Sequence, residues 1–128
     1  MASELRVDTL KDSSGNNSVG MSYVAEGTAK HWHTSDGSGT VAVNDSFNNS
    51  SITDAATGRY DFVFTNNFST LNFSPTSNCN SNTASSWGDG GNATFSKATS
   101  GYRIGSNGTS NTAVDSNFVQ VGAWGDLA

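Results

Sequence analysis

Two short runs in the middle of the sequence place a large side chain at every second position. The second run, residues 59–66, puts Tyr60, Phe62 and Phe64 on one face of an extended chain. That two-residue period is typical of a β-strand with one buried side. The first run, residues 40–54, shows the same alternation in its first half, through Val41, Val43, Asp45 and Phe47.

Gly58 lies between these two runs, in the turn sequence AATG. Glycine adopts the positive φ angles that tight turns need, so the two runs are predicted to pair as an antiparallel hairpin. Ile52 is out of phase with the apolar positions before it. A bulge or bend near residues 48–51 would explain the change of phase.

The rest of the chain consists of short strand candidates separated by turns rich in Asn, Ser and Gly. No helix of usual length can be placed, because apolar residues do not recur at three- and four-residue spacing. We therefore predict an all-β fold, a small antiparallel β-sandwich or barrel-like domain with an extended N-terminal strand. The other strand candidates are residues 1–12, 19–24, 28–34, 69–74, 93–98, 101–106 and 117–124.

The composition indicates a small core. Hydrophobic residues make up 34% and charged residues 13% of the 128 residues, and both fractions are low for a globular protein. Association of chains would bury more apolar surface, so we expect a homotrimer. The chain divides into an extended N-terminal segment (residues 1–26) and a β-rich domain (residues 27–128). The domain contains a long polar loop at residues 75–92.

The charge and the single cysteine exclude several functions. A net charge of −5 argues against a nucleic-acid partner and against an anionic membrane surface. No apolar run approaches the length of a membrane span or a signal-peptide core, so we expect synthesis in a cytoplasm, no export by a cleaved signal and no membrane insertion. Cys79 lies in the polar loop without a basic neighbour, which predicts an unreactive thiol.

Signatures of common enzyme classes do not occur in the sequence. It has no G-x-S-x-G, phosphate loop, paired-cysteine zinc motif or H-E-x-x-H, which are the motifs with the clearest chemical meaning. We therefore expect no enzymatic activity, no catalytic residue and no cofactor.

Both histidines flank Trp32, in the stretch His31-Trp32-His33. In a strand the two imidazoles share one face and the indole takes the other. One interpretation turns Trp32 into the core and leaves both histidines in solvent. The other brings three copies of the pair together on a threefold axis, where six nitrogens could surround a transition-metal ion.

The loop of residues 75–92 carries a third kind of candidate site. Trp87 stands there beside glycines, with Asp89 and Asn92 close in sequence. An exposed indole can stack on a sugar ring while Asp and Asn bond its hydroxyls, so these residues are candidates for glycan contact. Alternatively, Trp87 folds down and anchors its own loop. We expect Trp32 and Trp124 to be core residues or subunit contacts.

Residues 27–68 follow a pattern of short motifs: Ala-Lys before a Trp strand, a Gly turn, a Val-x-Val strand leading to Ser-Phe-Asn, then Ser-x-Thr-Asp, a second Gly turn and a Tyr-x-Phe-type strand. This pattern resembles a module of tail fibres and other virion structural proteins of tailed bacteriophages, especially phages of cyanobacteria and marine bacteria. The opening stretch SELRVDTLKDSSG is similar to the start of such virion proteins. The module carries other residues where His31 and His33 stand, so the histidines fall outside the resemblance. The positions that fit its pattern are Ala29, Lys30, Trp32, Gly39, Val41, Val43, Ser46, Phe47, Asn48, Ser51, Thr53, Asp54, Gly58, Tyr60 and Phe64.

The resemblance implies a non-enzymatic virion protein, first of all a short trimeric tail fibre or fibre-like appendage. Leu5, Val7 and Leu10 of the N-terminal segment would then attach to other virion proteins or to sister chains, and outer loops could contact host surface glycans. Two alternatives stay open. One is a capsid decoration (cement) protein that stabilises the phage head, and the other is a free carbohydrate-binding module.

Overall fold

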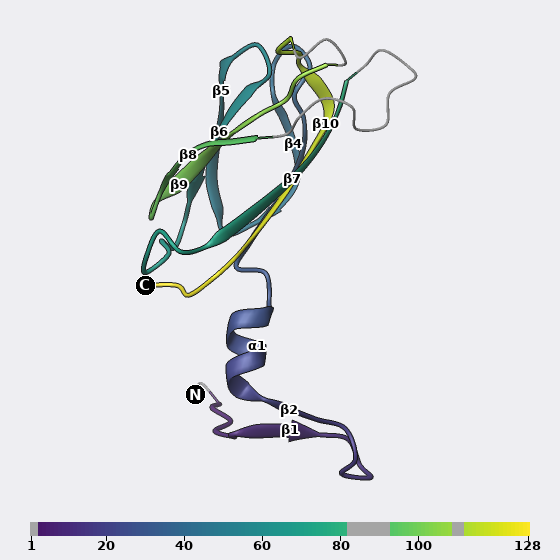
Figure 1. Cartoon of the computed structure of the whole chain (residues 1–128), viewed down its shortest axis with the longest axis vertical. Coiled ribbons are helices and arrows are strands. Elements are labelled where there is room, and N and C mark those ends of the chain that lie inside the picture. The colour runs from purple at the N-terminus through teal and green to yellow at the C-terminus, as the bar shows by residue number, and fades with distance from the viewer. Residues whose placement is uncertain (1–2, 82–92, 109–111) are drawn as a thin grey trace.

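A computed structural model describes residues 3–81, 93–108 and 112–128. Two four-stranded antiparallel sheets, with strand orders β4-β3-β10-β7 and β5-β6-β9-β8, face each other, and a two-stranded sheet, β1-β2, precedes them (Figure 1). The protein is therefore all-β in its main part, with the layers of a β-sandwich. The elements are β1 (Thr9–Lys11), β2 (Ser18–Gly20), α1 (Met21–Gly27), β3 (His31–Asp36), β4 (Ala42–Phe47), β5 (Asn49–Ala56), β6 (Arg59–Phe64), β7 (Ser74–Ser81), β8 (Ala93–Ala98), β9 (Gly101–Gly105) and β10 (Ser116–Trp124).

The predicted hairpin exists between β5 and β6, and Gly58 in its turn has a φ of 63°. Gly58 also has no room for a side chain, because an added Cβ would lie 2.4 Å from the carbonyl oxygen of Ser106. The prediction was wrong about the first half of the run, since β4 pairs with β3 in the other sheet. The run predicted as one strand is thus two strands.

Asn48 is the point at which the chain passes from one sheet to the other. Its φ of 55° is the left-handed conformation that few residues other than glycine adopt. Its side-chain amide donates to the carbonyls of Lys30 and Asn66 and accepts from the Asn66 amide, at 2.7–3.0 Å. This crossing explains the change of phase that the sequence showed near residues 48–51.

The core lies between the two sheets and is unusually aromatic. The alternation in β6 buries Tyr60, Phe62 and Phe64, as predicted, and Tyr102 and Ile104 of β9 lie on the same inward face. The facing sheet contributes Val119, Val121 and Ala123 of β10 and Cys79 of β7, while Phe68 and Phe73 close one end with stacked rings 4.4 Å apart.

A buried tyrosine hydroxyl ties the two layers together. Tyr60 donates to the Gly37 carbonyl at 3.1 Å and accepts from the Ser116 amide at 3.0 Å. Gly37 directly follows β3 and Ser116 begins β10, so both partners come from the opposite layer of the sandwich. Its buried oxygen is thereby satisfied, which is the condition for placing a tyrosine in a core at low cost.

Several large aromatic residues lie on the outer face of their sheet. Trp32 is 39% exposed, Phe118 55% and Phe47 50%, and Trp124 is half-buried. The core interpretation of Trp32 and Trp124 was therefore wrong, because each strand turns its other set of alternate residues inward. Their interpretation as subunit contacts stays a prediction. In β10 the inward set contains Val119 and Val121 but not Phe118 or Trp124.

The structure also corrects some strand boundaries. Residues 69–73 form no strand, and β7 covers Ser74–Ser81, the first part of the predicted loop 75–92. Residues 21–24, predicted as a strand, belong to helix α1. Within the described residues no helix is long and apolar enough to cross a membrane.

Candidate functional sites

The histidine pair lies inside the sandwich. His31 and His33 are 0% and 2% exposed, on the inward face of β3. His31 lies edge-on to Phe64, with ring centroids 5.0 Å apart, and His33 lies edge-on to Phe62 at 5.1 Å. Neither interpretation from the sequence is correct, because the imidazoles face neither solvent nor other chains. A threefold axis could reach these rings only if the two sheets separated.

His31 makes two side-chain contacts across the core. Its Nδ1 lies 3.2 Å from the Tyr102 hydroxyl, and its Nε2 lies 3.3 Å from Asn49 Oδ1. The neutral tautomer with its proton on Nε2 satisfies both, because Nε2–H donates to Asn49 and the Tyr102 hydroxyl donates to Nδ1. His31 therefore acts as a structural polar group that joins β3 to the opposite sheet.

Burial favours the neutral form of both imidazoles. It lowers the pKa of His31 to about 4, with a partly opposing effect of the Asn49 contact and a small lowering by His33. Burial also lowers the pKa of His33. Neither ring nitrogen of His33 has a hydrogen-bond partner among the described residues, and the same holds for the neighbouring Ser35 hydroxyl.

Cys79 lies on the core side of β7 and not in a surface loop. It is 7% exposed, and burial raises the pKa of its thiol to about 12. A thiol with this pKa holds little thiolate at neutral pH, and the thiolate is the reactive form. The prediction of an unreactive cysteine thus keeps its support, although the reason is burial in the core.

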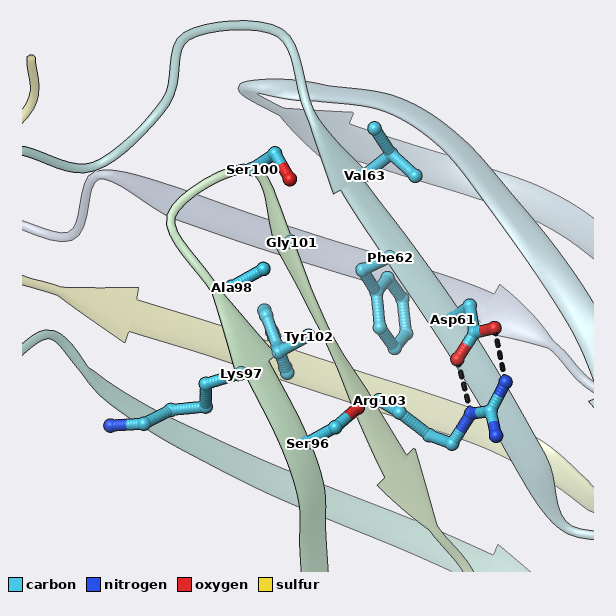
Figure 2. Close-up of a pocket in the computed structure, with 10 residues that line it drawn as sticks. All are labelled: Asp61, Phe62, Val63, Ser96, Lys97, Ala98, Ser100, Gly101, Tyr102 and Arg103. Atoms are coloured by element: carbon cyan, nitrogen blue, oxygen red, sulfur yellow. Dashed lines mark hydrogen bonds and ion pairs between the residues drawn. The ribbon is translucent and has the colours of Figure 1, made fainter. Parts of the chain in front are cut away.

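The outer face of the β5-β6-β9-β8 sheet carries a shallow hollow lined by charged side chains (Figure 2). Arg103 of β9 donates two hydrogen bonds to its cross-strand neighbour Asp61, at 2.5 and 2.6 Å. Lys97 extends to the other side, where its ammonium donates to the Phe73 carbonyl at 3.0 Å. Because these charges are already paired within the chain, the hollow fits a structural role better than a binding role.

The outer face of the other sheet carries a groove between two tryptophans, which we call the indole groove. Trp32 of β3 is the cross-strand partner of Gly122 in β10, and Gly122 in turn pairs with Thr76 of β7. The groove has a volume of about 330 Å³, at the lower end of the range for ligand pockets. Its lining consists of Ala29, Trp32, Thr76, Ser77, Asn78, Gln120, Val121, Gly122 and Trp124.

The sequence interpretation missed this groove because it assigned both tryptophans to the core or to subunit contacts. A usable signal was present in residues 117–124, NFVQVGAW. There, the alternate positions Gln120 and Gly122 are poor core residues, and they share their face with Trp124. The glycan candidates Trp87, Asp89 and Asn92 lie outside the described residues.

The N-terminal segment holds the candidate attachment residues. Leu5 and Leu10 are 81% and 43% exposed, and Val7 is half-buried. Helix α1, which ends one residue beyond the segment, has no buried residue, and its Tyr23 is 76% exposed. The hairpin β1-β2 and the helix project beyond one end of the sandwich, and the C-terminus lies at that same end (Figure 1).

Comparison with known proteins yields no relative on which an assignment could rest. No family model matches the chain, and neither a curated protein nor a solved structure shows significant similarity to it.

Proposed function

We propose that this chain is a non-enzymatic structural protein of a tailed-phage virion, a short trimeric fibre or fibre-like appendage. The observation that carries the proposal is the N-terminal segment, which exposes Leu5, Leu10 and Tyr23 outside the sandwich. A segment that buries so little of its own apolar surface is stabilised when a partner covers it. The resemblance of residues 27–68 to a module of tailed-phage virion proteins supports the choice of this kind of particle.

Trimer formation by sister chains fits the same observation. The sandwich has its own aromatic core, so the segment is the part of the chain that most needs a partner. Interlaced copies of the segment would bury Leu5, Leu10 and Tyr23 against each other and against the next virion protein. The sandwich would then stand away from the attachment point, as the arrangement in Figure 1 suggests.

The oligomeric state tests the assembly part of the proposal. Sedimentation equilibrium of the full chain should give the mass of three chains. The double variant Leu5→Glu, Leu10→Glu should shift the protein toward monomer, because charges would enter the buried contact. Ser13→Glu, at an exposed polar position of the same hairpin, is the matched control and should remain trimeric. A wild-type monomer at high concentration would contradict the trimer.

The position in the particle tests the fibre part. Gold-labelled antibody against the sandwich should mark the tail of intact virions in electron micrographs. Label on the head alone would contradict the fibre and identify a capsid decoration protein. Particles without any label would contradict the virion assignment altogether.

A further inference from the structure

The two tryptophans of the indole groove are held in a defined arrangement. An added Cβ on Gly122 would lie 2.9 Å from the six-membered ring of Trp124, so that ring occupies the place of a side chain at residue 122. Trp124 stands two residues further along the same face of β10, so its indole must run along the sheet. Trp32 lies on the neighbouring strand, directly opposite Gly122.

The aromatic surface continues beyond the groove. Phe47 of β4 is the cross-strand partner of Trp32 and is 50% exposed. Adjacent strands lie about 4.8 Å apart. Phe47, Trp32 and the Trp124 ring over Gly122 therefore form an aromatic row across three strands of one sheet face.

Free hydrogen-bonding groups lie next to this aromatic row. Asn78 and Gln120 are cross-strand neighbours and both are exposed, as is Thr76. Within the described part of the chain none of these three side chains has a hydrogen-bond partner. Each amide offers two donors and one acceptor oxygen. The groove thus combines flat apolar rings with uncommitted neutral polar groups.

The electrostatics of the groove restrict its ligand. None of the residues that line it carries a charge, and the whole chain has a net charge of −5. An anionic ligand would find no cation among these residues, and the net negative charge of the chain would repel it. A neutral ligand with an apolar face and several hydroxyls matches both the aromatic rings and the neutral polar side chains of the groove.

We propose that the indole groove binds a neutral glycan. A sugar ring packs its C–H face on Trp32 and the Trp124 indole, and its hydroxyls bond Asn78 and Gln120. Phe47 extends the contact to the next sugar ring of an oligosaccharide. This inference takes its biological setting, an appendage of a virion, from the proposed function, but the binding itself is a property of the purified protein.

A second copy of the chain is the other occupant to consider for this face. A protein partner would have to satisfy the amides of Asn78 and Gln120 and the hydroxyl of Thr76, since buried polar groups without partners are costly. The centre of a protein interface is usually depleted of such groups. A glycan instead brings a hydroxyl for each of them, which favours the sugar.

The test uses the full chain on an array of neutral and acidic oligosaccharides, followed by titration of a bound neutral oligosaccharide. We expect binding to neutral glycans only. Trp32→Ala should weaken binding about tenfold or more, and Gln120→Ala, an exposed position that leaves the packing intact, severalfold. Phe118→Ala is the matched control, because this aromatic is 55% exposed on the same face of β10 and does not line the groove.

Four results would overturn the inference. These are no binding to any neutral glycan, preference for acidic glycans, equal affinity of wild type and Trp32→Ala, or equal loss in Phe118→Ala. A Trp32→Ala variant that changes only the oligomeric state would assign the face to a second copy. The labelling of virions is independent of all these outcomes, so the sugar site and the virion assignment can fail separately.

Discussion

Acidification from pH 7 to pH 5 is expected to destabilise this protein through His31. The ring has a pKa of about 4 in the folded protein, compared with 6.5 for an exposed histidine. Between these values the unfolded chain binds a proton that the folded chain excludes, so stability falls as the pH falls. For one such group the loss between pH 7 and pH 5 is about 2 kcal/mol.

Urea denaturation at pH 7, 6 and 5 measures this loss, and His31→Gln is the reference variant. A glutamine amide does not titrate, yet it can accept from Tyr102 and donate to Asn49. Carboxylates and His33 are present in both proteins, so the difference between the two pH profiles isolates His31. Parallel profiles would refute the reasoning. So would a folded-state NMR titration of the His31 ring with a pKa near 6.5, because that value belongs to a hydrated imidazole.

Three further predictions concern single side chains. His33→Leu should leave the free energy of unfolding unchanged or raise it by up to about 1 kcal/mol, because it removes two buried nitrogens that lack partners in the described structure. Thermal denaturation checks this, and a loss above about 2 kcal/mol would show that the nitrogens are satisfied. Asn48→Ala should cost about 3 kcal/mol, since the variant loses both the tolerance of a φ of 55° and the hydrogen bonds of the amide. Asn48→Gly keeps the backbone freedom and should cost clearly less in the same urea experiment; equal costs would assign the whole effect to the hydrogen bonds. Arg103→Met should lower stability by no more than about 1 kcal/mol, because its ion pair with Asp61 is half-exposed. The loss should shrink in 1 M NaCl, and a loss that is independent of salt would point to packing of the arginine stem.

Some of the fold follows from local patterns alone. In residues 59–64 only one of the two alternate sets, Tyr60, Phe62 and Phe64, is strongly apolar, so its burial is determined without knowledge of any partner strand. Gly58 marked the turn, and the change of phase before Ile52 marked the crossing at Asn48. The strand candidates at residues 93–98, 101–106 and 117–124 are also confirmed, within one residue at each end, as β8, β9 and β10.

Other elements of the fold could not be predicted from local sequence patterns. Helix α1 has seven residues and no buried face, so it leaves no periodic signal in the sequence. The polar run of residues 74–81 contains few apolar residues, yet it forms β7 because β10 offers a complete row of backbone partners. Strands of this kind owe their existence to pairing across the sheet and not to their own composition.

The stretch His31-Trp32-His33 shows which features follow from the sequence alone and which depend on the tertiary structure. Alternation along the strand determined that both imidazoles share one face and the indole takes the other. It did not determine which face is inside, and hydrophobicity favoured Trp32. The register with β10 decided which face of the strand is buried, because residues directly opposite in neighbouring strands point to the same side of the sheet. His31 and His33 pair with the buried Ala123 and Val121, whereas Trp32 pairs with Gly122 on the outer face.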